Sequence, residues 1–122
     1  MGVSTDAYLF YGVHITEGED LPELNVTEEE WEEKYFGCFD EYLAGNLKVE
    51  GVEFDSHCHH EYPYYFLCVK RERAARGYPE DISPEFLKID TEKADRLLQE
   101  ALDQLGFKAL DKPGWKLASY WG

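Results

Sequence analysis

The sequence predicts one α+β domain over residues 1–122, with the ferredoxin-like order strand, helix, strand, strand, helix, strand. Two segments identify the sheet, because residues 7–15 and 64–69 are apolar on both alternating faces, as in central strands. A third segment identifies a helix, since the stretch from Thr91 to Gly106 has an apolar stripe at helical spacing. We therefore expect a split βαββαβ fold, a four-stranded antiparallel sheet with two helices on one face.

The first half contains the first strand, residues 7–15, and one expected helix. Residues 16–25 are acidic and lack periodicity, which is typical of an exposed loop. Thr27 and Glu30 then match a capping box, which indicates a helix start, and Gly45 is a suitable helix stop. One face of this helix is expected to be apolar, with Trp31, Tyr35, Cys38, Phe39 and Tyr42.

The second half supplies the remaining elements. Residues 47–55 alternate weakly and predict an edge strand. Residues 71–90 predict a long connection with a short helical turn starting at Ser83, and residues 115–121 predict the last strand. In this topology the first and third strands are central, which agrees with their two apolar faces.

Length and composition favour one packed core. A chain of 122 residues with 43% hydrophobic and 16% aromatic residues is too apolar for a disordered segment. Its three cysteines are an odd number in a chain long enough to fold without cross-links, so we expect buried thiols and a cytoplasmic location. No apolar segment is long enough to span a membrane, and no motif indicates a cofactor.

The charge is concentrated in the first half of the chain. The formal net charge is −14; residues 1–62 hold 16 acids against Lys34 and Lys48, while residues 63–122 hold ten acids and ten bases. Such a field repels nucleic acids and anionic membranes and attracts basic protein surfaces. We therefore expect a protein partner, with no direct nucleic-acid or membrane binding.

The acidic run from Glu17 to Glu33 is the first candidate site, because it holds nine acids and no base. Concentrated charge of one sign destabilises a folded domain by self-repulsion unless a partner or an ion offsets it. The candidate binding residues are Glu19, Asp20, Glu23, Glu29, Glu30 and Glu33.

A histidine cluster is the second candidate site. Residues 57–60 read His-Cys-His-His, and in an extended chain His57 and His59 face the same side about 6 to 7 Å apart. This spacing allows both to bind one metal ion, with His14 on a neighbouring strand as a further candidate. The alternative is a histidine-rich turn between the second and third strands, with Cys58 filling a small apolar space.

The basic residues Arg71, Arg73 and Arg76 form a third feature, on the expected long connection. One interpretation is a solvated loop. The other is a structural homodimer in which these arginines meet the acidic half of a second copy.

Both ends of the chain and one internal segment carry a recognisable pattern. The segments are residues 4–12 (STDAYLFYG), residues 113–122 (PGWKLASYWG) and residues 57–69. They resemble the corresponding parts of short acidic proteins encoded by tailed bacteriophages and prophages. The resemblance implies an accessory protein that binds and disables a host protein, such as nucleic-acid-guided defence machinery, and it carries over no functional residue.

The leading functional hypothesis is a non-enzymatic binding protein of the host cell cytoplasm. Its acidic residues would occupy a basic surface of a host nucleic-acid-binding or defence protein by mimicking the charge of nucleic acid. The alternatives are a metal-binding protein or metal-dependent enzyme that uses His57 and His59, and the structural homodimer.

Overall fold

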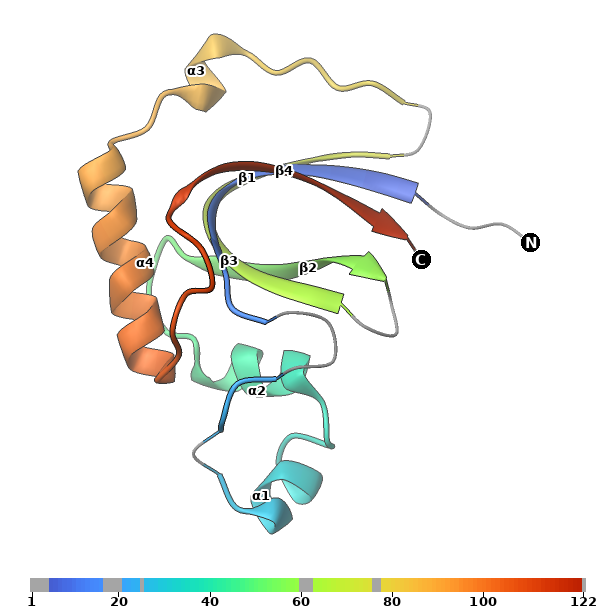
Figure 1. Cartoon of the computed structure of the whole chain (residues 1–122), viewed down its shortest axis with the longest axis vertical. Coiled ribbons are helices and arrows are strands. Elements are labelled where there is room, and N and C mark those ends of the chain that lie inside the picture. Colours follow the sequence, from blue (N-terminus) through green and yellow to red (C-terminus); the bar gives the residue numbers. More distant parts are fainter. Residues whose placement is uncertain (1–4, 17–20, 25, 60–62, 76–77, 122) are drawn as a thin grey trace.

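A computed structural model describes residues 5–16, 21–24, 26–59, 63–75 and 78–121. Within these ranges the chain forms one strongly curved sheet with helices on its outer side (Figure 1). The strands are β1 (Thr5–His14), β2 (Glu53–His59), β3 (Pro63–Ala74) and β4 (Gly114–Trp121). The helices are α1 (Glu28–Glu33), α2 (Phe39–Asn46), α3 (Pro84–Leu87) and α4 (Thr91–Leu105).

The predicted α+β fold is confirmed. The hydrogen-bonded order is β4-β1-β3-β2, with antiparallel pairs throughout this series and β1 and β3 at its centre. The helix expected from Thr91 is α4, where Asp90 caps the first turn by accepting from the Lys93 amide. Gly106 ends α4 in the left-handed conformation, with φ of 75°.

The sheet is bent so far that its two outer strands meet. A β-bulge interrupts the pairing of β1 with β3 between Tyr11 and Gly12, and bulges bend strands. At its far end β2 pairs in parallel with β4, through Cys58 opposite Tyr120 and the next residue of each strand, so the four strands form a closed barrel. The sequence pattern predicted that the first and third strands are central, without predicting this closure.

Gly12 allows the tight approach of β1 to β3 at the bend. A Cβ atom at this position would lie 1.9 Å from the carbonyl oxygen of Leu67, well inside van der Waals contact. The clashing atom belongs to the backbone of a central strand, so it cannot move aside as a side chain does. Only a residue without a side chain fits here.

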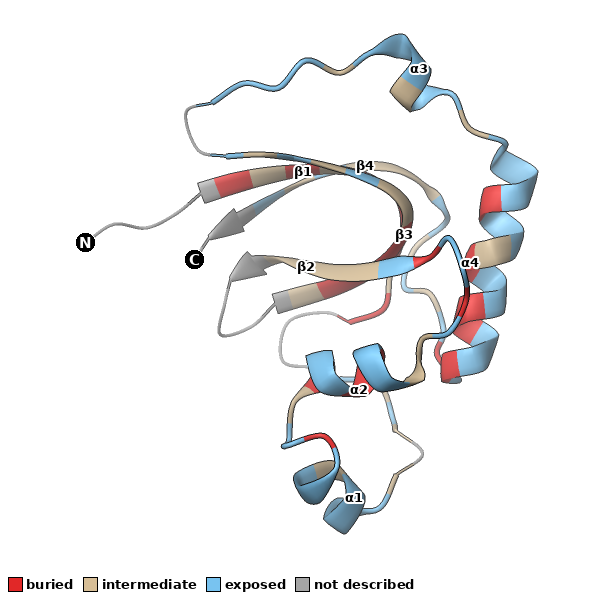
Figure 2. Ribbon diagram, turned by 180° about the vertical axis from the view of Figure 1, so that it is seen from behind, coloured by how far each residue is buried: buried red, intermediate tan, exposed pale blue. Residues whose placement is uncertain are grey.

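The bend divides the apolar residues into an outer and an inner core (Figure 2). The outer core lies between the convex side of the sheet and helices α2 and α4, and it includes Val13, Leu43 and Leu98. The inner core lies between the two halves of the folded sheet. Its buried residues among those described are Tyr8, Phe10, Phe66 and Cys68, with the rings of Phe10 and Phe66 stacked at 3.7 Å.

The single helix predicted from Thr27 to Gly45 is wrong, because the chain breaks between α1 and α2. Phe36 and Gly37 both adopt the left-handed conformation, with φ of 54° and 63°. In a continuous helix Trp31 and Tyr42 would lie about 16 Å apart along the axis. The break brings their ring centroids to 6.5 Å, so both rings contribute to the outer core.

Two other boundaries differ from the prediction. The strand expected at residues 47–55 begins at Glu53 and continues through His59, because residues 49–52 form a turn in which Val49 and Val52 face the outer core. The expected turn at His57 is therefore part of a strand. The connection expected from residue 71 begins later, since residues 71–74 extend β3 and pair with β1.

Within the described ranges, no helix combines the length and the apolar character that crossing a lipid bilayer requires.

We expect Gly12→Ala to lower the free energy of unfolding by about 3 kcal/mol or more, because the added methyl group overlaps a backbone oxygen. Gly114→Ala is a matched control, since Gly114 is the register partner of Gly12 on β4 and a Cβ there has no neighbour within 4 Å. Urea unfolding of both variants measures the difference. Equal stability of the two would contradict this account of the bend.

Candidate functional site

Two histidines meet on the inner side of the folded sheet. His14 ends β1 and His57 lies in β2, and their Nε2 atoms are 2.6 Å apart. The ring centroids are 4.8 Å apart and the rings are nearly perpendicular. We refer to His14 and His57 as the histidine pair. The bend creates this contact, because β3 separates the two strands in the sheet order.

Asp111, in the segment between α4 and β4, fixes the orientation of His14. Its Oδ2 atom is 2.7 Å from Nδ1 of His14, and its Oδ1 atom accepts a hydrogen bond of 2.8 Å from the His14 backbone amide. The ammonium group of Lys116 lies 3.4 Å from Oδ2. Burial acts to raise the pKa of the Asp111 carboxyl, but the hydrogen bonds from His14 outweigh it and lower the pKa. Asp111 is therefore a carboxylate at neutral pH.

His57 is held as a neutral imidazole. Burial, followed by the proximity of His14, lowers its pKa from 6.5 to about 4. A neutral imidazole has one ring nitrogen that donates and one that accepts or binds a metal. With Nδ1 of His14 directed at the carboxylate, the Nε2 atoms are the nitrogens that face each other, in a carboxylate–imidazole–imidazole series suited to proton transfer or metal binding.

A pocket of about 360 Å³ opens beside the histidine pair. The rings of Phe10 and Phe66 pack against His14 from the inner core. The pocket therefore has an apolar wall and one group of titratable side chains. Its lining residues are His14, Thr16, His57, Tyr64, Leu110 and Asp111.

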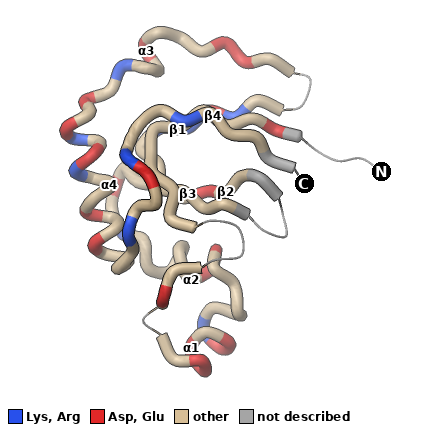
Figure 3. The backbone as a smooth tube through the Cα atoms, in the orientation of Figure 1, with Lys and Arg blue, Asp and Glu red and all other residues tan. Residues whose placement is uncertain are grey.

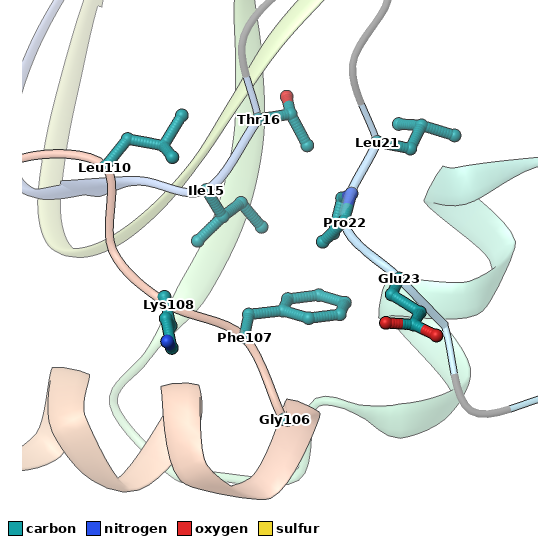
Figure 4. A pocket seen from close by; sticks show the side chains of 9 residues that line it. All are labelled: Ile15, Thr16, Leu21, Pro22, Glu23, Gly106, Phe107, Lys108 and Leu110. Carbon is teal, nitrogen blue, oxygen red and sulfur yellow. The ribbon is translucent and has the colours of Figure 1, made fainter.

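A larger pocket of about 470 Å³ lies next to it (Figure 4). Thr16 and Leu110 line both pockets. In the larger one the rings of Phe107 and Pro22 point toward each other, and Glu23 and Lys108 are its charged residues. A mainly apolar lining with one carboxylate and one ammonium group suits binding better than catalysis.

The acidic residues predicted as a binding site are only partly placed. Glu23, Glu29, Glu30 and Glu33 are exposed, the last three on α1, while Glu19 and Asp20 lie outside the described residues. Figure 3 shows the acidic positions of α1 at the end of the molecule remote from β1 and β4. No ion pair among the described residues involves any of these acids.

Among the described residues, one apolar side chain attaches helix α1 to the rest of the protein. Trp31 is half-buried and packs against Tyr35 and Tyr42, while the other five residues of α1 are exposed glutamates. Phe36, just beyond the helix, is 75% exposed. We refer to residues 28–36 together with Glu23 as the acidic lobe. The sequence pattern did not single out Phe36, because an isolated aromatic residue gives no periodic signal.

The arginines expected to meet a second copy have partners within the chain. Arg71 lies 3.5 Å from Glu53 and also pairs with Asp55, and Arg73 pairs with Asp6. Arg76 lies outside the described residues. These pairings occupy Arg71 and Arg73, the two described arginines that the homodimer hypothesis names.

The metal-ligand candidates and the thiols that were expected to be buried are placed in part. The side chains of Cys58 and His59 lie outside the described residues, and in the remainder no group of three or more His, Cys, Asp or Glu side chains is arranged to hold a metal ion. Burial raises the pKa of the Cys68 thiol to about 12, which makes it a poor nucleophile. Asp111 was not predicted, because a single carboxylate before the last strand has no recognisable motif.

The chain matches no protein-family model, no curated protein and no solved structure.

We expect Asp111→Ala to lower the free energy of unfolding by about 2 to 3 kcal/mol, because it leaves the His14 amide and Nδ1 without their acceptor. Asp103→Ala is the control, since the exposed Asp103 side chain accepts, among the described residues, from Gln99 alone. Urea unfolding at pH 7 compares the two variants. If Asp111→Ala costs no more than the control, Asp111 does not hold β1 in place.

Proposed function

We propose that the acidic lobe binds a basic region of a partner protein and that the chain acts through this binding without catalysing a reaction. The observation that carries the proposal is the density of carboxylates on α1, where five of six residues are exposed glutamates and none has an ion pair among the described residues. Early glutamates also suit the positive end of the helix dipole, so the folded helix tolerates them. Helix α1 therefore stays folded while its glutamates are exposed to solvent.

The spacing of this charge is close to that of duplex DNA. With a rise of about 1.5 Å per residue, the five glutamates of α1 supply one negative charge for roughly every 1.8 Å of helix axis. Duplex DNA carries one negative charge for about every 1.7 Å of its axis. A protein groove that binds a nucleic-acid backbone is therefore electrostatically complementary to α1.

The positions of the basic residues support the assignment of partner binding to the acidic lobe. Lys34 is the single base between Glu23 and Glu41. Arg71, Arg73 and Lys116 are held by carboxylates elsewhere in the fold, so they do not neutralise α1. The resemblance of the chain ends to phage proteins favours a host nucleic-acid-binding or defence protein as the partner, in the cytoplasm of that host.

We expect the triple variant Glu23→Lys, Glu29→Lys and Glu33→Lys to lose capture of bacterial proteins by at least tenfold, because it reverses the field that steers association. The measurement is capture on immobilised protein from a bacterial lysate, followed by elution with duplex DNA. If α1 occupies the nucleic-acid groove of a captured protein, duplex DNA competes for that groove and releases the captured protein from the immobilised wild-type chain.

The control triple variant, Glu80→Lys, Glu92→Lys and Glu100→Lys, changes the net charge equally at exposed positions outside the lobe. It is expected to retain capture. Capture that survives both reversal of the lobe and high salt would contradict the proposal, as would equal loss in the two triple variants.

Phe36 provides a second test, because it is exposed and also strained by its positive φ. An exposed aromatic residue just beyond the glutamates of α1 is suited to anchor an interface. We expect Phe36→Gly to change the free energy of unfolding by no more than about 1 kcal/mol, since glycine adopts this conformation freely. Capture of the DNA-eluted proteins should fall by at least tenfold.

Leu117→Ser is the matched control for Phe36→Gly, because Leu117 is 79% exposed on β4, outside the lobe. It should leave capture unchanged. Undiminished capture by the Phe36 variant would remove this residue from the proposed interface.

A further inference from the structure

We propose that the histidine pair binds one transition-metal ion through the Nε2 atoms of His14 and His57. This inference is independent of the acidic lobe. Ions that favour imidazole ligands are Zn²⁺, Cu²⁺ and Ni²⁺, whereas Mg²⁺ and Ca²⁺ favour oxygen ligands. The proposal differs from the pair expected from spacing alone, His57 and His59, because its second ligand comes from another strand.

The first argument is the convergence of the two nitrogens. The Nε2 atoms are 2.6 Å apart, with the rings nearly perpendicular, and both histidines line the pocket, so one ion at its edge can contact both nitrogens. A tetrahedral ion with Zn–N bonds of 2.0–2.1 Å requires a separation of about 3.3 Å between them. Small rotations about the side-chain bonds of either histidine supply this opening of roughly 0.7 Å.

The second argument is the carboxylate behind His14. Histidines that bind metals almost always direct the other ring nitrogen to a carboxylate, a carbonyl or water, which fixes the tautomer and raises ligand basicity. Asp111 makes this contact, at 2.7 Å from Nδ1 of His14. Because Asp111 also accepts from the His14 backbone amide at 2.8 Å, the imidazole and the strand that carries it are held together.

The third argument is the space beside the pair. The pocket of about 360 Å³ leaves room on one side for water or a small ligand to complete the coordination sphere. On the other side Phe10 and Phe66 exclude further ligands. No third His, Cys, Asp or Glu joins the two nitrogens within the described part of the chain, so the proposed site is open, with two protein ligands.

The experiment uses tag-free full-length protein and Cu²⁺ as the probe, with excess Mg²⁺ present to occupy the surface carboxylates. Pulsed electron paramagnetic resonance detects the remote ring nitrogens of bound imidazoles and therefore counts them. We expect one Cu²⁺ per chain with two imidazoles in the wild-type protein. Asp111→Asn, which perturbs a positioning residue, should weaken binding by about 10- to 100-fold while the count stays at two.

His14→Gln and His57→Gln should each reduce the imidazole count by one and weaken Cu²⁺ binding at least tenfold. Thermal unfolding checks that each variant folds, and if one does not, the other tests the same pair of ligands. The lobe variant Glu23→Lys, Glu29→Lys, Glu33→Lys is the control and should bind Cu²⁺ as the wild type does, so the two proposals fail separately. An unchanged count in a folded histidine variant, or no stoichiometric binding by the wild type, overturns the inference.

Discussion

The close contact between the backbones of β1 and β3 at Gly12 is the constraint on which the architecture depends. With no Cβ between them, the strands approach closely enough for a bulge to bend the sheet until β2 meets β4. The bend then determines how side chains pack on the outer and the inner side of the sheet. Its outer side is long enough for α2 and α4 to bury one apolar face each, and its inner side is narrow enough for Phe10 and Phe66 to stack.

The sequence predicted the strands and the helix whose apolar residues repeat at a regular spacing. It did not predict the features that depend on the bend of the sheet. The apolar faces of β1 and β3 and the stripe of α4 depend only on the local period of the chain. The break at Phe36 was not predictable, since it places a bulky residue at positive φ, against its own preference. The sequence named His14 as a further ligand candidate beside His57 but did not predict their direct contact, because strands two positions apart in an open sheet lie about 10 Å from each other.

The two candidate sites use opposite physical strategies. In the acidic lobe, exposed carboxylates with no ion pair among the described residues lie on a helix whose one apolar side chain, Trp31, is half-buried, so their field extends into solvent. At the histidine pair, the Asp111 carboxylate contacts the backbone amide and imidazole of His14 and the ammonium group of Lys116. Its charge therefore acts at short range, where it orients the His14 ring. The first arrangement suits long-range attraction, and the second suits short-range chemistry.

The attachment of α1 through one half-buried side chain, Trp31, in the part of the chain that the structure describes affects how readily this helix opens. A segment with so few buried contacts opens locally at much lower free energy than the sheet, and its amide hydrogens exchange with solvent correspondingly faster. Docking must then order this segment as well as neutralise its charge, and the entropy lost subtracts from affinity. Because few contacts hold α1, the helix can adjust its angle to grooves of different width. This favours binding to several related partners rather than to one.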